Sequence, residues 1–109
     1  MAEEAKIIAQ SAPSATTETV LYTVPAATQF IGSTLRVCNR GSGATSFRIA
    51  LRPAGAATTD EMYIAFDIPV AGSDTIGITD GITLGATDDI TVYAGNENLS
   101  FNLSGVEIT

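Results

Sequence analysis

Residues Leu35–Arg52 read Leu-Arg-Val-Cys-Asn-Arg-Gly-Ser-Gly-Ala-Thr-Ser-Phe-Arg-Ile-Ala-Leu-Arg. Apolar and polar residues alternate on both sides of a Gly-rich segment, a pattern typical of two β-strands joined by a turn. We therefore predict a β-hairpin that turns near residues 42–45. Because side chains alternate between the faces of a strand, the core face of this hairpin would carry five apolar side chains, those of Leu35, Val37, Phe47, Ile49 and Leu51.

The opposite face of the hairpin would carry four of the five basic residues in the chain. An antiparallel register about this turn pairs Arg36 with Arg52 and Arg40 with Arg48. Like charges directly opposite each other are unfavourable by up to about 1 kcal/mol a pair, so an acidic group is expected to neutralise them. Arginine is favoured at interfaces because its planar guanidinium binds carboxylates with two hydrogen bonds. We predict a protein–protein contact through these arginines, with a second copy or an acidic partner; the alternative is a solvated face that prevents edge pairing.

Composition limits the class of protein. A chain of 109 residues suits one domain with its own core. No apolar run approaches the ~20 residues of a membrane span, and the acidic start is unlike a signal peptide, so we expect no membrane partner. A net charge of −7 argues against nucleic acid as a partner. Cys38 is the only cysteine, which excludes an intrachain disulfide and predicts a partly buried small side chain rather than a reactive thiol.

The rest of the chain predicts further strands. Alternating or short apolar runs lie in residues 17–24, 61–67, 73–94 and 99–108, with turn signals between them and no helical spacing. We predict an all-β, single-domain protein, an antiparallel β-sandwich or jelly roll of about eight strands. Residues 1–16 would form an N-terminal arm with an edge strand before Pro13, and residues 17–109 the β-sandwich domain.

Residues suited to catalysis or metal binding are few. The chain has no histidine and one cysteine, so the usual nucleophile–base pairs and zinc or copper sites cannot be assembled. We predict no enzyme activity, no catalytic residue, no cofactor and no metal site. Acidic residues lie at predicted turns, where bonding to the backbone is favoured over a calcium site or a carboxylate dyad. These residues are Asp60, Glu61, Asp74, Asp80, Asp88 and Asp89.

Strand and turn phrases along residues 17–109 resemble a known group of proteins. Examples are Leu21-Tyr-Thr-Val-Pro-Ala, Tyr63-Ile-Ala-Phe-Asp and Leu99-Ser-Phe-Asn-Leu-Ser-Gly-Val-Glu-Ile-Thr. They resemble small β-rich virion structural proteins of tailed bacteriophages. The resemblance implies a homo-oligomer, with a trimer as the expected form, attached to other virion proteins such as the major capsid protein.

Two classes of function follow as expectations. The first is a capsid decoration (cement) protein, made in the host cytoplasm and located in the virion, which oligomerises and stabilises the head. A neck, collar or tail component is a close alternative. The second class is a receptor- or carbohydrate-binding β-module that uses Tyr93 with Asn96 and Asn98, with or without calcium.

Overall fold

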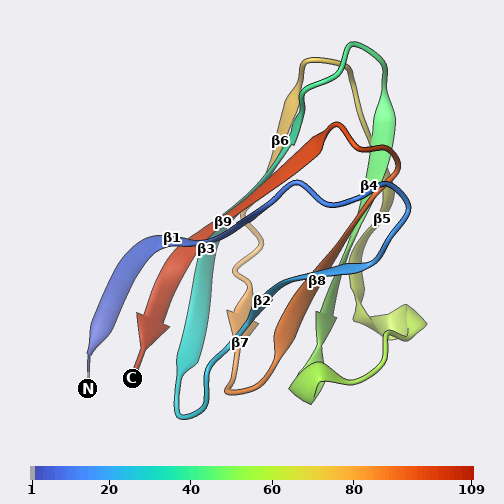
Figure 1. Ribbon diagram of the computed structural model, residues 1–109. Helices are drawn as coiled ribbons and strands as arrows, with labels where there is room; N and C mark the ends of the chain where they lie inside the picture. Colours follow the sequence, from blue (N-terminus) through green and yellow to red (C-terminus); the bar gives the residue numbers. More distant parts are fainter. Residues whose placement is uncertain (1) are drawn as a thin grey trace.

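The fold is a two-layered β-sandwich, as the sequence predicts (Figure 1). The computed structural model describes residues 2–109. These residues form nine strands and two short 3₁₀ helices. The strands are β1 (Glu3–Ser11), β2 (Thr19–Thr23), β3 (Gln29–Asn39), β4 (Thr45–Arg52), β5 (Tyr63–Val70), β6 (Thr75–Ile78), β7 (Thr83–Leu84), β8 (Asp89–Ala94) and β9 (Leu99–Ile108). The helices η1 (Pro53–Gly55) and η2 (Asp60–Met62) lie between β4 and β5.

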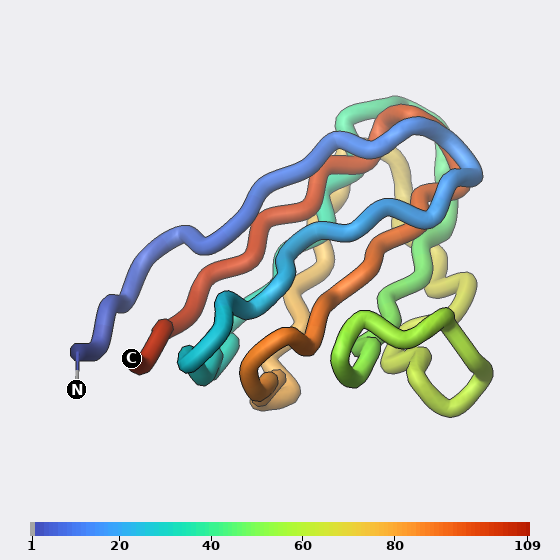
Figure 2. The backbone as a smooth tube through the Cα atoms, turned by 60° about the horizontal axis from the view of Figure 1, so that its bottom comes forward, coloured from blue at the N-terminus to red at the C-terminus, as the bar shows by residue number. Residues whose placement is uncertain are grey.

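The two layers are antiparallel sheets, which we call sheet A and sheet B. Sheet A has the order β1-β9-β3-β6, with β7 also paired to β3. Sheet B has the order β2-β8-β4-β5. Figure 2 shows β1 and β9 side by side, with both ends of the chain at the same end of the sandwich. Consecutive strands mostly alternate between sheets, so most strand pairs join distant parts of the chain.

The predicted hairpin across residues 35–52 is wrong, because its two strands belong to different sheets. Strand β3 pairs with β9, β6 and β7 in sheet A. Strand β4 pairs with β5 and β8 in sheet B. The Gly-rich segment, residues 40–44, therefore carries the chain from one layer to the other. The predicted core face is nevertheless correct for Leu35, Val37, Phe47 and Ile49, which are all buried. Leu51, the fifth predicted core residue, is only partly buried, because the alternation of β4 ends at the buried Ala50.

The side chain of Asn39 holds the crossing in place. It is only 1% exposed and lies at the end of β3, where the chain leaves sheet A. Its Nδ2 lies within hydrogen-bond distance of three carbonyl oxygens, those of Gly43 (2.9 Å), Val70 (3.3 Å) and Ala71 (3.2 Å). Its Oδ1 accepts a hydrogen bond from the Gly41 amide at 2.9 Å. One side chain thus joins the crossing segment to the end of β5.

The crossing also packs directly on the connection between β5 and β6. The Ser73 amide donates to the Gly41 carbonyl at 2.8 Å. A Cβ on Gly72 would lie 2.1 Å from the Ser42 carbonyl oxygen, so only glycine allows this approach. The two connections at this end of the sandwich therefore fix each other.

The core lies between the sheets and contains most of the large apolar side chains. Phe47 and Phe101, from opposite sheets, pack edge to face with ring centroids 6.3 Å apart. Other fully buried members include Phe30, Leu35, Ile49, Ile90, Leu99 and Leu103. No helix among residues 2–109 is long and apolar enough to cross a membrane.

The predicted N-terminal arm, residues 1–16, contains strand β1. This strand pairs with β9 of the same chain from Glu3 opposite Ile108 to Ser11 opposite Phe101. The register shifts between Ile7 and Ala9, so a bulge at Ile8 divides β1 into two regular parts. Residues 3–11 are thus the edge strand of sheet A.

We predict that Asn39→Asp lowers the free energy of unfolding by about 2–3 kcal/mol. The substitution keeps the shape of the side chain, but replaces its buried donor with an acceptor that faces carbonyl oxygens. Urea unfolding followed by circular dichroism measures the change.

The matched control for this prediction is Asn102→Asp. Asn102 lies on the outer face of sheet A, and its Oδ1 accepts from Gln10 Nε2, which an aspartate also allows. We expect a change within about 0.5 kcal/mol for the control. Equal effects of the two substitutions would contradict the role of Asn39.

Candidate functional site

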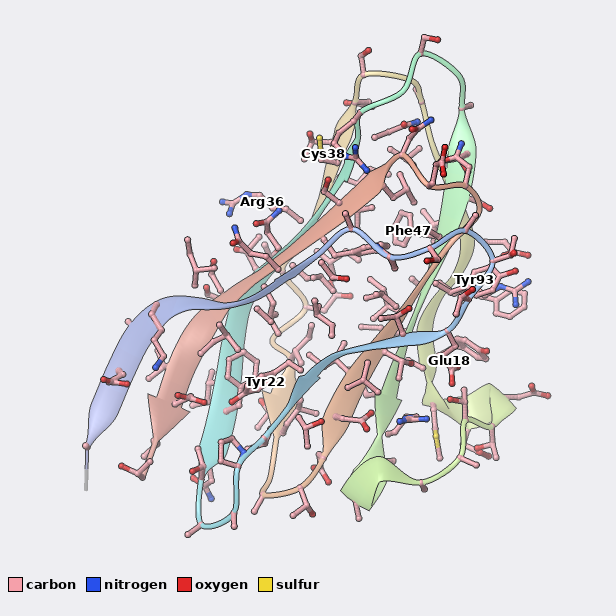
Figure 3. All side chains as sticks on the ribbon, in the orientation of Figure 1. Glu18, Tyr22, Arg36, Cys38, Phe47 and Tyr93 are labelled. Atoms are coloured by element: carbon pink, nitrogen blue, oxygen red, sulfur yellow. The ribbon has the colours of Figure 1, made fainter. Side chains whose placement is uncertain are left out.

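The four arginines predicted to share one face lie on two opposite faces of the sandwich. Arg36 and Arg40 point outward from sheet A, whereas Arg48 and Arg52 point outward from sheet B. Arg36 lies opposite Asn102 rather than Arg52, so the predicted arginine pairs do not form. Figure 3 shows Arg36 on the side of the molecule away from Tyr93, the residue opposite Arg48.

The two arginines of sheet B are neutralised within the chain. Arg52 donates Nε and Nη2 to the two carboxylate oxygens of Asp89 at 2.8 and 2.9 Å, and Nη1 lies 3.5 Å from Glu18. This bidentate bond to Asp89 raises the pKa of Arg52 further above its ordinary value. The Asp89 side chain is only 5% exposed, so this pair fixes the neighbouring ends of β4 and β8.

The two arginines of sheet A differ, because no carboxylate among residues 2–109 lies within ion-pair distance of either. Both are exposed. Arg40 donates instead to Ser100 Oγ at 2.7 Å and to the Glu97 carbonyl at 2.8 Å. These two positive charges therefore remain available to an acidic surface.

Arg48 lies at the centre of a group of aromatic side chains on sheet B. Its guanidinium carbon is 4.1 Å from the centroid of the Phe66 ring and 4.6 Å from that of Tyr93. It binds the Asp67 carboxylate through Nε at 2.7 Å and Nη2 at 3.3 Å, which raises its pKa. Tyr63 packs edge to face on Phe66, with centroids 5.0 Å apart. We call these five residues the aromatic–arginine cluster.

The backbone of β5 presents the aromatic–arginine cluster to solvent. Asp67 has a φ of +52°, which is uncommon outside glycine, and the register between β4 and β5 shifts beside it. Ala65 points into the core, while Phe66 is 52% exposed. Stacking and the ion pair hold Arg48 and Phe66 in fixed positions, so the cluster is ordered before any partner binds.

No family model, curated protein or solved structure matches this chain. The sequence singled out Arg48 and Tyr93 in separate hypotheses, but it gave no indication that Phe66 and Asp67 would join them.

The acidic residues predicted at turns include one that binds both its own turn and the helix η1. Asp88 accepts hydrogen bonds from the amides of Ala54 and Gly85, each at 2.9 Å. Asn96, considered above with Tyr93, accepts from the Asn98 amide in the turn between β8 and β9. Among residues 2–109, no group of three His, Cys, Asp or Glu residues is placed to hold a metal ion.

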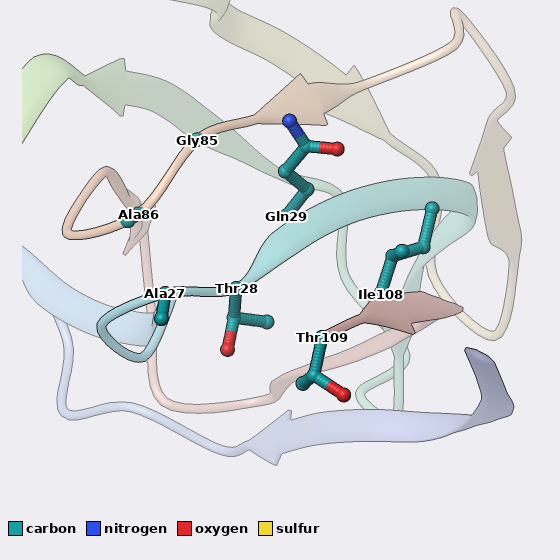
Figure 4. A pocket seen from close by; sticks show the side chains of 7 residues that line it. All are labelled: Ala27, Thr28, Gln29, Gly85, Ala86, Ile108 and Thr109. Atoms are coloured by element: carbon teal, nitrogen blue, oxygen red, sulfur yellow. The ribbon is translucent and has the colours of Figure 1, made fainter. Parts of the chain in front are cut away.

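A hollow of about 380 Å³ lies at the end of the sandwich near the C-terminus (Figure 4). Small or uncharged side chains line it: Ala27, Thr28, Gln29, Gly85, Ala86, Ile108 and Thr109. This lining offers no charged side chain and no aromatic ring, so it does not indicate a ligand class.

Tyr22 and Glu107 join the two sheets near the same end. The Tyr22 hydroxyl donates to the Glu107 carboxylate, and Lys6 Nζ lies 3.3 Å from the same carboxylate. Burial and this hydrogen bond raise the pKa of Tyr22 well above its ordinary value. The same hydrogen bond lowers the pKa of Glu107.

We predict that this contact makes stability depend on pH. Because the folded protein holds the pKa of Glu107 below its ordinary value of 4.5, the stabilisation is present at neutral pH and is lost as the pH falls below 4.5 and through the lower folded pKa. Glu107→Gln should cost about 1 kcal/mol at pH 7 and should reduce the loss of stability on acidification. Urea unfolding at several pH values measures both effects.

The control is Glu97→Gln, which removes the same charge from an exposed turn. It should leave the pH dependence of the wild type unchanged. If Glu107→Gln also leaves that dependence unchanged, Glu107 does not contribute to it.

Proposed function

We propose that this protein is a non-enzymatic virion structural protein of a tailed bacteriophage, of the capsid decoration type. It is made in the host cytoplasm, oligomerises, and attaches to another virion protein such as the major capsid protein. The resemblance of its strand and turn phrases supports the class of protein. A small β-sandwich with side chains suited to interfaces on an outer face supports a role in assembly.

The aromatic–arginine cluster is the main structural support for this proposal. Arg, Tyr and Phe are the residue types enriched at the centres of protein interfaces. Here Arg48 is neutralised by Asp67 before binding, so burial of the cluster would not leave a charge without a counter-ion. The cluster therefore suits contact with a protein surface.

The exposed apolar side chains of β5 extend this surface. Ile64 is 40% exposed and Phe66 52%, and both flank the buried Ala65 on the outer face of this edge strand. A row of large apolar side chains on an exposed edge favours aggregation unless another protein covers it. We infer that a virion protein covers this row.

A neck, collar or tail component would need the same kind of surface. The number of copies per particle distinguishes these locations from the head. A decoration protein follows the shell lattice and is present in hundreds of copies. A neck or tail protein follows a ring and is present in about a dozen copies.

A carbohydrate-binding module is the second candidate, and the three rings of the cluster favour it, with Phe66 exposed and Tyr63 and Tyr93 partly exposed. Sugars stack on the faces of aromatic rings, however, and Arg48 already covers one face of Phe66 and one of Tyr93. This arrangement favours a protein partner. Glycan binding that is lost in Phe66→Ser, with no incorporation of the protein into particles, would favour the module instead.

We predict that Phe66→Ser reduces incorporation into particles at least tenfold, which corresponds to about 1.4 kcal/mol or more of contact free energy. Phe66 is half exposed, so the fold should persist. A phage lacking the gene is supplied with wild-type or variant protein, and copies per purified particle are counted by quantitative mass spectrometry.

Ile31→Ser is the matched control, since Ile31 is 46% exposed on the opposite face. It should retain the wild-type copy number. Absence of the wild-type protein from particles would overturn the virion function, whereas normal incorporation of Phe66→Ser would overturn the role of the cluster.

A further inference from the structure

Strand β1 is the terminal strand of sheet A, and its first part has one side free (Figure 2). Ala2 and Thr109 exchange two backbone hydrogen bonds, of 3.0 and 2.8 Å. In an antiparallel pair such bonded positions alternate, so Glu4 and Lys6 also bond toward β9. The amides and carbonyls of Glu3, Ala5 and Ile7 therefore point to the free edge.

The other edges of the sandwich are short or interrupted. Strand β2 has five residues and a register shift, and β6 has four residues. Strand β5 contains Pro69, which cannot donate, and the bulged Asp67. By contrast, Glu3–Ile7 is regular and free of proline. It is the edge best suited to accept another strand.

We propose that a second copy of this chain pairs with β1 in antiparallel orientation, about a two-fold axis at Ala5. Ala5 then exchanges both backbone hydrogen bonds with Ala5 of the partner subunit, and Glu3 pairs with Ile7 of the partner subunit. The two A sheets become one continuous sheet. An isologous contact of this kind closes as a dimer.

Charge selects this register. Within each chain Lys6 Nζ already lies 2.9 Å from the Glu4 carboxylate. Across the axis, Glu4 lies opposite Lys6 of the partner subunit and Lys6 opposite Glu4 of the partner subunit, so the four groups alternate in charge. An axis at Glu4 or at Lys6 would satisfy the same hydrogen-bond alternation, but it would place like charges directly opposite each other. Such like-charge pairs are unfavourable in a sheet. Only the axis at Ala5 makes the Glu4–Lys6 segment complementary to itself.

The outer face of sheet A also becomes continuous in this register. Ile31, Val106 and Ala5 lie directly opposite one another across β3, β9 and β1. Pairing at Ala5 joins this row to the same row of the second copy. Ile7, 62% exposed beside the row, gains a neighbouring strand. The contact thus lowers the exposure of apolar side chains that the monomer leaves in water.

This inference depends on the self-association in the proposed function, but not on the partner that the aromatic–arginine cluster binds. It differs from the trimer that the resemblance implies, because a three-fold assembly requires a head-to-tail contact. The two contacts use opposite sheets, so they can be tested separately.

The test uses Glu4→Lys and Lys6→Glu in the full chain, with mass measured by sedimentation equilibrium at low salt. Each variant alone places like charges across the axis, so its dimer dissociation constant should rise at least tenfold. An equimolar mixture of the two variants restores opposite charges and should recover a dimer of wild-type affinity. The double variant Glu4→Lys, Lys6→Glu should also dimerise. Thermal unfolding of each variant establishes that it is folded.

Two controls locate the contact. Glu97→Lys, in an exposed turn, repeats the charge change of Glu4→Lys and should leave the dimer intact. Arg36→Glu repeats the change of Lys6→Glu on the outer face of sheet A and should do the same. Pairing through β1 is overturned if the β1 variants do not weaken the oligomer, or if Arg36→Glu dissociates it to the same extent. Either result leaves self-association in place. A wild-type monomer at millimolar concentration overturns self-association as well, while attachment through Phe66 is decided by the particle experiment.

Discussion

The arrangement of both layers depends on the hydrogen bonds of one buried side-chain amide, that of Asn39. Asn39 ends β3 with its side chain out of water, and the carbonyl oxygens it reaches belong to the crossing segment and to the end of β5. An unpaired amide at that position would cost more than the net gain of a typical hydrogen bond. The chain therefore leaves sheet A where Asn39 requires it, and β4 begins in the other layer. This crossing places Arg48 and Arg52 on the face opposite Arg36.

The sequence allowed the class of fold and the orientation of single strands to be predicted, but not their pairing. Alternation depends only on neighbouring residues, and it assigned Leu35 and Phe47 correctly to the core. Pairing depends on residues far along the chain, such as Leu103 opposite Leu35. A Gly-rich segment suits both a tight turn and a crossing between layers, so residues 40–44 did not distinguish the two. The position of Asn39 at the end of the alternating run was the available signal.

The candidate site was predictable only in part, for a related reason. The expectation that each arginine needs a carboxylate was sound in physical terms, and Arg48 and Arg52 do have one. Asp67 and Asp89 supply these carboxylates from strands that lie beside β4 only after folding. The exposure of Phe66 could not be predicted either, because hydrophobicity alone assigns a phenylalanine in an alternating strand to the core. The bulge at Asp67 places Phe66 on the outer face of the edge strand, and no local sequence pattern predicts this bulge.

The outer faces of the two sheets are consequently different in kind. On sheet B, charges are paired within the chain and aromatic rings are held in place, so binding there would bury a surface that is already neutral and ordered. On sheet A, Arg36 and Arg40 lack carboxylate partners among residues 2–109, and the first part of β1 leaves the backbone groups of its free edge to solvent. A paired charge costs less to bury than an unpaired one, whereas unpaired groups gain from a partner that supplies the missing charge or strand. Because the sheets face opposite ways, one subunit has the geometry to hold a neighbour through the edge of sheet A while sheet B rests on another protein.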